Sequence, residues 1–233
     1  MKLQDSLDEI NRQLLQVLDP TDRAALEAAI ERLRMLQIVE QGLVVGDVLP
    51  DFALPDRNSR IVTSGELLER GPLVTTFFRG PWCPYCSLTL EALNEVRPSV
   101  ERSGGSVVAV APLGPEELSQ LASERGLGLQ LLSDQGAAYA QVCGVKFEMT
   151  EGGTQLYARL AARFGLVIPG QDAAGGWELP IPATYVADRD GVIGYAFGDA
   201  DWSRRADPVE IVAAVERLAL KPPRWSAEPS AEA

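Results

Sequence analysis

Two cysteines separated by two residues, Cys83 and Cys86, are the side chains of this sequence best suited to chemistry. An apolar, β-favouring run at residues 73–78 precedes them, and a helix is predicted from about Tyr85 onwards. This spacing places both thiols within one turn, where the helix N-terminus favours a thiolate through its dipole and free N–H groups. A thiolate attacks a disulfide or a peroxide oxygen, and the neighbouring thiol resolves the product. The pattern therefore predicts a redox-active dithiol.

Three neighbouring residues are expected to support the pair. Pro84 removes one helix donor and stiffens the turn, and Trp82 would cover the thiols on one side. Arg79 stands just before the tight turn, where it would either stabilise the thiolate or orient a peroxide. The alternative for Arg79 is a solvated surface charge, and the sequence leaves both interpretations open.

A zinc site is the main alternative use of two cysteines at this spacing. Zinc needs about four ligands, whereas the sequence adds only Cys143 to the pair and contains no histidine. The missing histidine also excludes Ser-His-Asp and Cys-His catalytic sites. We therefore expect no metal and no other cofactor. Cys143, near a predicted helix end, is expected to be a buried apolar side chain rather than a resolving thiol.

The composition predicts a soluble globular protein. Of 233 residues, 46% are hydrophobic and 23% are charged, which is usual for that class. The net charge of −12 argues against binding to nucleic acid or to an anionic membrane, because both would repel the protein. We find no secretory signal and no apolar run of membrane-spanning length. The expected location is the cytoplasm, where a close cysteine pair indicates catalysis rather than a structural disulfide.

Strand-like and helix-like segments alternate through residues 43–220, which predicts an α/β fold with a mixed central sheet flanked by helices. Residues 146–179 interrupt the alternation with a helix near 155–164 and a Gly-rich loop at 170–176. Residues 221–233 are expected to form a loose tail. Further strands are predicted at 106–111, 129–132, 183–187 and 192–197, with helices that begin at Pro115 and Pro208.

Residues 1–42 are predicted to form a helical hairpin ahead of the main domain. The first helix begins near a capping box at Ser6 and stops before Pro20. The second is expected to run from about Thr21 to Gln41, with Gly42 as its C-terminal cap. Two amphipathic helices cannot bury their apolar stripes alone. They therefore pack either on the main domain or on another subunit, as in a homodimer.

Pro182 is a second element of the expected site. It follows a β-branched residue and directly precedes the strand at 183–187, so it is a candidate cis-proline. A cis bend beside the cysteines would free main-chain groups to pair with a bound substrate. The alternative is an ordinary trans-proline at the start of a strand.

Four segments in order carry a resemblance to a known family: PDFALPD at 50–56, FRGPWCPYC at 78–86, LSD at 132–134 and PATYVADRDG at 182–191. Together they resemble the peroxiredoxin-like branch of the alkyl hydroperoxide reductase/thiol-specific antioxidant (AhpC/TSA) family. The resemblance implies a thioredoxin-like fold and a thiol peroxidase that uses a thiol reductant such as thioredoxin. The N-terminal hairpin is also similar to that of this branch.

The family's Pro-x-x-x-Thr-x-x-Cys motif ends in the cysteine that attacks peroxide. In that register Arg79 stands at the proline, Cys83 at the threonine and Cys86 at the attacking cysteine, while Pro182 takes the place of an arginine. A resemblance to thioredoxins instead makes Cys83 the nucleophile and Cys86 the resolver. The helix position favours Cys83 as the more exposed thiol. Cys-Pro-Tyr-Cys is also the glutaredoxin tetrad, which implies glutathione as a second reductant.

Three functions therefore remain open. The first is thiol-dependent reduction of peroxides, and the second is reduction of protein disulfides in the manner of thioredoxin or glutaredoxin. The third is a redox sensor or scaffold without turnover.

Overall fold

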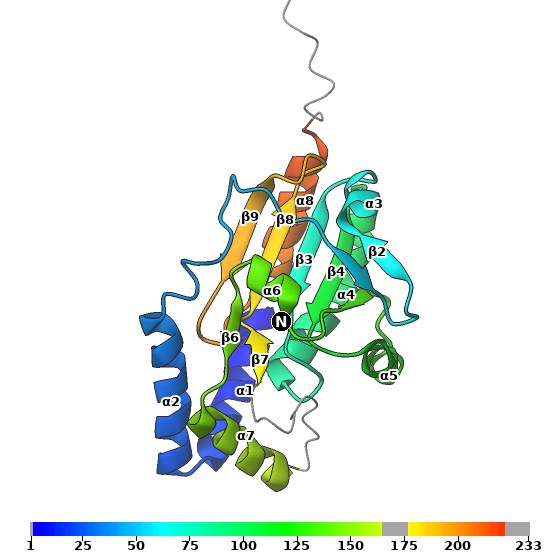
Figure 1. The fold of residues 1–233 in the computed structure, drawn as a ribbon. Coiled ribbons are helices and arrows are strands. Elements are labelled where there is room, and N and C mark those ends of the chain that lie inside the picture. The colour runs from blue at the N-terminus through cyan, green and yellow to red at the C-terminus, as the bar shows by residue number, and fades with distance from the viewer. Residues whose placement is uncertain (1, 165–176, 222–233) are drawn as a thin grey trace, which may run out of the picture.

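A computed structural model describes residues 2–164 and 177–221 (Figure 1). Its centre is a five-stranded mixed sheet in the order β5-β4-β3-β8-β9. The three strands β3, β4 and β5 are parallel, and β8 runs antiparallel to both of its neighbours. The predicted α/β fold with a mixed sheet is confirmed. The strands are β3 (Leu73–Phe77), β4 (Ser106–Ala111), β5 (Gln130–Ser133), β8 (Ala183–Ala187) and β9 (Ile193–Gly198).

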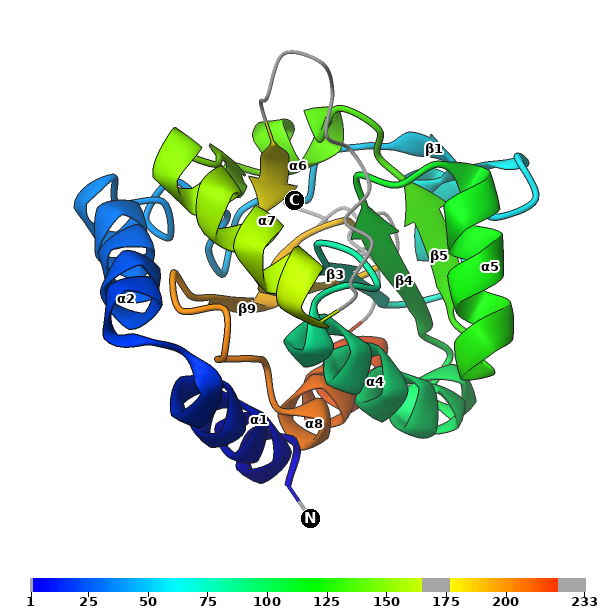
Figure 2. The ribbon, with the colours of Figure 1, turned by 90° about the horizontal axis from the view of Figure 1, so that it is seen from below.

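Helices cover the sheet and bury it. Helices α4 and α8 pack against each other on one face, and α5 packs against β5 (Figures 1 and 2). All five residues of β3 are buried, as expected for a central strand with both faces covered. The helices of this region are α3 (Ser64–Leu68), α4 (Pro84–Arg102), α5 (Pro115–Arg125), α6 (Ala138–Val142) and α8 (Pro208–Ala219).

Two small antiparallel sheets were not predicted. Strands β1 (Ala53–Pro55) and β2 (Ile61–Thr63) pair with each other, as do β6 (Lys146–Glu148) and β7 (Glu178–Pro180). The β6–β7 pair joins the two ends of the 146–179 interruption. Its helix, α7 (Glu151–Phe164), begins earlier than predicted. The Gly-rich loop at 170–176 and all of the predicted tail except its first residue lie outside the described residues.

The two N-terminal helices are α1 (Leu3–Val17) and α2 (Pro20–Met35). The prediction that the second helix continues to residue 41 was wrong. Gln37 has a left-handed backbone, with φ of 51°, which ends the helix because a continuing turn needs negative φ. Gly42 is consequently not its cap.

Both N-terminal helices pack on the main domain of the same chain. Helix α1 contacts α4, and α2 contacts α7, more extensively than they contact each other. The side chain of Leu7 in α1 is fully buried. The guanidinium of Arg159 in α7 donates to the carboxylate of Asp22 in α2 at 2.7 and 3.1 Å. The apolar stripes therefore find their partners without a second subunit.

Replacing Leu7 with alanine is expected to lower the free energy of unfolding by about 2–5 kcal/mol, because it leaves a cavity between α1 and the domain. Chemical denaturation measures the loss. The matched control is Leu220→Ala, since Leu220 is largely exposed and its removal should cost little. Equal, small losses in the two variants would show that α1 is not docked in solution.

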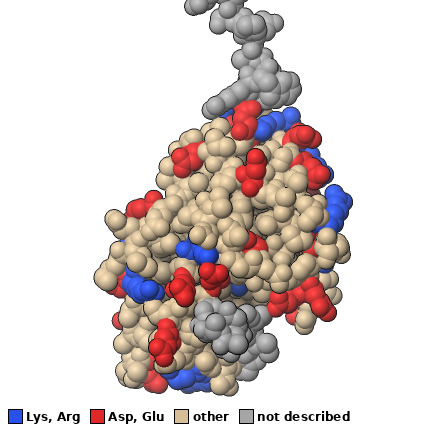
Figure 3. All heavy atoms as spheres, viewed as in Figure 1, with Lys and Arg blue, Asp and Glu red and all other residues tan. Residues whose placement is uncertain are grey.

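The charged side chains are dispersed on the face seen in Figure 3. Lys and Arg lie among Asp and Glu there and do not gather into one continuous patch. None of the helices in the described parts of the chain is long and apolar enough to cross a membrane.

Candidate active site

Cys83 and Cys86 lie at the N-terminus of α4, just beyond the end of β3. Cys83 is the residue before the helix, Pro84 occupies its first position, and Cys86 lies in its first turn. Proline suits the first position because its missing N–H would have no helical partner there. The turn requires Gly80, which has φ of +150° and where a Cβ would approach Trp82 Nε1 to 2.6 Å. Sequence and local geometry therefore place the two thiols as predicted.

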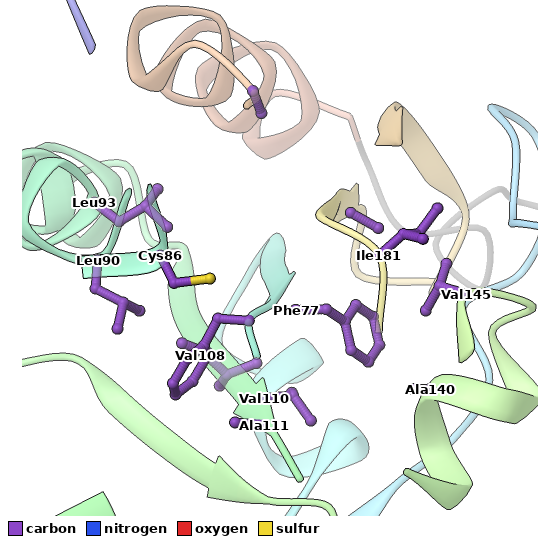
Figure 4. Close-up of a cluster of buried hydrophobic side chains, with 14 of the residues drawn as sticks. Phe77, Cys86, Leu90, Leu93, Val108, Val110, Ala111, Ala140, Val145 and Ile181 are labelled. Carbon is purple, nitrogen blue, oxygen red and sulfur yellow. The ribbon is translucent and has the colours of Figure 1, made fainter. Parts of the chain in front are cut away.

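Both thiols are buried, which corrects the expectation that Cys83 is the more exposed. The exposed fractions are 1% for Cys83 and 2% for Cys86, and both cysteines are free. Figure 4 shows Cys86 within the core, on the same helix as Leu90 and Leu93 and with its sulfur directed towards Phe77. A buried thiolate is costly unless charges or hydrogen bonds compensate it. The site must therefore supply that compensation.

Arg79 supplies the first compensating charge. Its side chain is buried, its Nη2 lies 3.1 Å from Cys83 Sγ, and its Nη1 donates to the hydroxyl of Tyr157 at 3.0 Å. The guanidinium also lies 5.2 Å from the ring centre of Trp82 and 5.3 Å from that of Trp202, within cation–π range. The alternative interpretation of Arg79 as a solvated surface charge is therefore excluded.

Arg205 supplies the second compensating charge. It lies in the loop between β9 and α8, is half-buried, and its Nη2 is 3.6 Å from Cys86 Sγ. Each sulfur thus has its own guanidinium. Sequence reasoning missed Arg205 because it follows Cys86 by 119 residues and no motif marks it. Only the return of the chain from β9 to α8 brings it to the pair.

The two thiols share one proton. Burial raises the pKa of both, but at Cys86 the hydrogen bond from the Cys83 thiol and the charges of Arg205 and Arg79 outweigh it, so the pKa of Cys86 falls well below its usual value. The pKa of Cys83 lies well above its usual value because of burial and because its thiol donates to Cys86. These directions favour ionisation of Cys86 before Cys83.

Aromatic rings close the site on one side. Trp82 packs edge-on against Tyr157 with ring centres 5.2 Å apart, and Trp177 lies 6.2 Å from Trp82 and 6.0 Å from Tyr157. Tyr157 and Trp177 both come from the 146–179 interruption, whose role the sequence did not reveal. This segment thus encloses the guanidinium of Arg79 and accepts one of its hydrogen bonds through Tyr157.

A pocket of about 560 Å³ opens beside the pair. Arg79, Trp82, Cys83 and Pro84 line it, together with residues of α1, α2 and α7. Cys86 is not among the residues that line the pocket, and its sulfur is within hydrogen-bonding reach of the Cys83 thiol. Four of the six predicted site residues therefore line one cavity, and a fifth, Cys86, lies next to Cys83.

Pro182 does not behave as predicted. The described residues contain no cis peptide bond, so the cis-proline prediction was wrong. Pro182 directly precedes β8, where its missing N–H interrupts no ladder of hydrogen bonds, and its carbonyl accepts from the N–H of Asp199 at 3.2 Å. It is also absent from the pocket lining. Pro182 is therefore an ordinary trans-proline at the start of a strand.

Cys143 is fully buried, away from the pocket lining. Burial raises the pKa of its thiol to about 12, although Tyr139 forms a hydrogen bond with it. In the part of the chain that the structure describes, no three Cys, Asp or Glu side chains are placed to share a metal ion.

Cys143→Ala is expected to leave the reactivity of the Cys83–Cys86 pair within about twofold of the wild type, because a thiol with so high a pKa does not form a thiolate near neutral pH. Steady-state assays at matched protein concentration measure this. Loss of turnover, or a mixed disulfide that includes Cys143 on mass analysis, would contradict its assignment as a core residue.

Comparison with known proteins adds a family and a fold. The model of the AhpC/TSA family matches residues 45–196. Peroxiredoxin Bcp of Escherichia coli is 28% identical over 103 residues, which cover 44% of this chain and 65% of that protein. The chain thus spans slightly less than two thirds of this relative. Methylamine utilization protein MauD of Paracoccus versutus is 32% identical over 91 residues, 39% of this chain and 44% of that protein.

Solved structures are similar in fold at low sequence identity. Peroxidoxin BcpB of Mycobacterium tuberculosis superposes with a TM-score of 0.55 at 21% identity, over 76% of this chain and 98% of that one. Peroxiredoxin Q of Xanthomonas campestris gives 0.52 at 15% identity, over 72% and 91% of the two chains. The thioredoxin-like fold of peroxiredoxins is therefore confirmed.

Proposed function

This chain belongs to the AhpC/TSA family, and from that premise we propose that it is a thiol-dependent peroxide reductase whose redox pair is Cys83 and Cys86. The observation that carries the proposal is a pair of buried cysteines with one guanidinium at each sulfur, Arg79 at 3.1 Å and Arg205 at 3.6 Å. Such an arrangement keeps a nucleophilic thiolate at neutral pH in a place where burial alone would protonate it.

In the first step the Cys86 thiolate attacks one oxygen of the peroxide. An S–O bond forms, the O–O bond breaks, and Cys86 becomes a sulfenic acid. The leaving oxygen departs with the electron pair of the O–O bond and takes the proton of the Cys83 thiol, which yields an alcohol or water. Arg79 and Arg205 stabilise the negative charge as it moves from sulfur to oxygen.

In the second step the Cys83 thiolate attacks the sulfur of the Cys86 sulfenic acid. A disulfide forms, and hydroxide leaves and is protonated to water. The short spacing in the helix allows this bond without a large rearrangement of the chain. An external thiol, such as thioredoxin or glutathione, then reduces the disulfide by exchange at Cys83, the sulfur that lines the pocket.

Rapid mixing of the pre-reduced protein with hydrogen peroxide or cumene hydroperoxide tests the proposal. Trp82, which packs beside the pair, should report oxidation through a change in fluorescence. We expect a second-order rate constant far above that of free cysteine. A rate no faster than free cysteine for either peroxide would rule the function out.

One observation favours disulfide reduction as a second candidate. Cys83, and not Cys86, lines the pocket, and disulfide exchange needs an accessible attacking sulfur. This function predicts that the protein reduces insulin and that Cys83→Ser abolishes the reaction. Insulin reduction that persists in Cys83→Ser excludes it, and the trans Pro182 already removes one feature that was expected to support it.

A further inference from the structure

The two N-terminal helices form one wall of the pocket beside Cys83. Figure 2 shows α1 alongside α4 and α8, at the end of α4 that carries the cysteines. The match to the family model begins at residue 45, so this wall is built from a part of the chain outside the shared family region. The wall consists of Ile10, Gln13, Leu14 and Val17 of α1 with Leu26 of α2.

The wall is predominantly apolar and follows one face of α1. Ile10, Leu14 and Val17 recur at intervals of four and three residues, which aligns them along the helix. Across the pocket stand Trp82 and Leu160. The walls thus offer apolar contact to a ligand that occupies the space between them.

Polar atoms without partners lie where the pocket meets the redox pair. Arg79 Nε and Ser87 Oγ are buried, belong to residues that line the pocket, and have no hydrogen-bond partner among the described residues. Buried polar groups in folded proteins normally have partners. An apolar enclosure with a polar end beside Cys83 suits a molecule with an apolar body and an oxygen-bearing reactive end.

The wall is anchored to the site. The hydroxyl of Tyr85, which lies between the two cysteines, donates to Asn11 Oδ1 of α1 at 3.0 Å. Arg159 ties α2 to α7 through Asp22. The pocket is consequently formed before a ligand binds, which reduces the ordering cost of binding.

We propose that α1 and α2 are a specificity element, with Leu14 and Val17 as selecting residues, which makes the enzyme prefer peroxides with an aliphatic or aromatic body over hydrogen peroxide. The proposal rests on the peroxide reductase function above. A pocket of about 560 Å³ falls within the usual range for small-molecule sites. Hydrogen peroxide has no apolar surface with which to use the wall.

The test measures the selectivity of the oxidative half-reaction, so that no reductant takes part. Pre-reduced protein is mixed with cumene hydroperoxide and, separately, with hydrogen peroxide, and the ratio of the two rate constants is compared among variants. Leu14→Asn and Val17→Thr place polar groups in the wall while keeping the branched shape of each side chain. We expect each to lower the ratio by about fivefold or more, since small changes in apolar pockets alter discrimination about 10-fold or more.

Val142→Thr is the matched control. Val142 is 65% exposed, compared with 41% for Val17; both are helical valines, and Val142 lies outside the pocket lining. Its ratio should equal that of the wild type. Equal ratios in all four proteins, with both peroxides reduced rapidly, would overturn the specificity wall but leave the proposed function intact.

A binding measurement tests the pocket separately from turnover. Cumyl alcohol, which lacks the O–O bond, is titrated against tryptophan fluorescence, because Trp82 and Trp202 line the pocket. We expect saturable binding that weakens at least about threefold in Leu14→Asn and is unchanged in Val142→Thr. If the protein reduces neither peroxide, the proposed function fails, and this titration alone decides whether the apolar pocket exists. If cumyl alcohol shows no saturable binding, the proposal of an apolar ligand pocket is overturned.

Discussion

Serine in place of Cys86 is expected to slow the reaction with peroxide by more than about 10³-fold, as loss of a nucleophile does in other enzymes. The reason is that Cys86 receives the stabilising contacts. It accepts a hydrogen bond from the Cys83 thiol and lies near the charges of Arg205 and Arg79, which together lower its pKa despite burial. A serine hydroxyl cannot ionise near neutral pH, so the nucleophile is lost. Stopped-flow oxidation of the pre-reduced variant measures the rate.

Cys83→Ser is the matched variant, with the same change one turn away. It should still react once with peroxide, because the Cys86 thiolate remains, but it cannot form the disulfide. We expect the sulfenic acid to accumulate, where dimedone trapping and mass analysis detect it on Cys86. If instead Cys83→Ser is the variant that fails to react and Cys86→Ser reacts normally, the roles of the two sulfurs are reversed, as in the thioredoxin-like assignment.

Arg79→Gln is expected to have the second-largest effect. Removing an adjacent opposite charge raises a thiol pKa by about 1–3 units, and each unit lowers the thiolate fraction about tenfold below that pKa. At pH values below the pKa of the Cys86 thiol, the peroxide reaction should therefore slow by roughly 10- to 10³-fold. The effect of Arg79→Gln on the thiol pKa should be large for two reasons. Arg79 is among the described charges closest to the sulfurs, and because it is buried, solvent screens its charge little.

The pH dependence has a definite sign. Arg79 stabilises the charged form of the pair, so its removal shifts thiolate formation to higher pH, and the rate of Arg79→Gln should recover as the pH rises. Ultraviolet absorbance of the thiolate, titrated in parallel, reports the shift directly. Arg204→Gln is the control, since Arg204 is exposed and adjacent to Arg205 in sequence. A slow rate in Arg79→Gln that does not recover with pH would assign Arg79 to structure rather than to thiolate stabilisation.

The regular part of the fold was predictable because it depends on local patterns. The strand before the cysteines, the helix that begins between them and the strand at 183–187 all lie where the sequence placed them. Short apolar runs and proline or glycine at defined positions determine such elements through backbone sterics and burial. The small sheets β1–β2 and β6–β7 were missed because three-residue strands carry too little pattern.

The sequence alone was also enough to single out Cys83 and Cys86 as the proposed redox pair. Two cysteines with two residues between them, placed after a strand and at a helix start, require no knowledge of the rest of the chain. The exclusion of histidine-based chemistry follows in the same way from composition. The isomer of Pro182 was not accessible at this level, because the preference between cis and trans before proline is only about 0.5–1 kcal/mol and its surroundings decide it.

Tertiary structure decided the electrostatics of the Cys83–Cys86 pair. Spacing alone favoured Cys83 as the exposed nucleophile, whereas both sulfurs are buried and Arg205 approaches Cys86 from a distant loop, which helps to lower the pKa of Cys86. A pKa depends on every charge and donor within a few ångströms, most of which are remote in sequence. The sequence by itself thus determined that the chain carries a dithiol at a helix start. The fold determined which guanidinium lies beside each sulfur and placed α1 and α2 along the pocket next to Cys83.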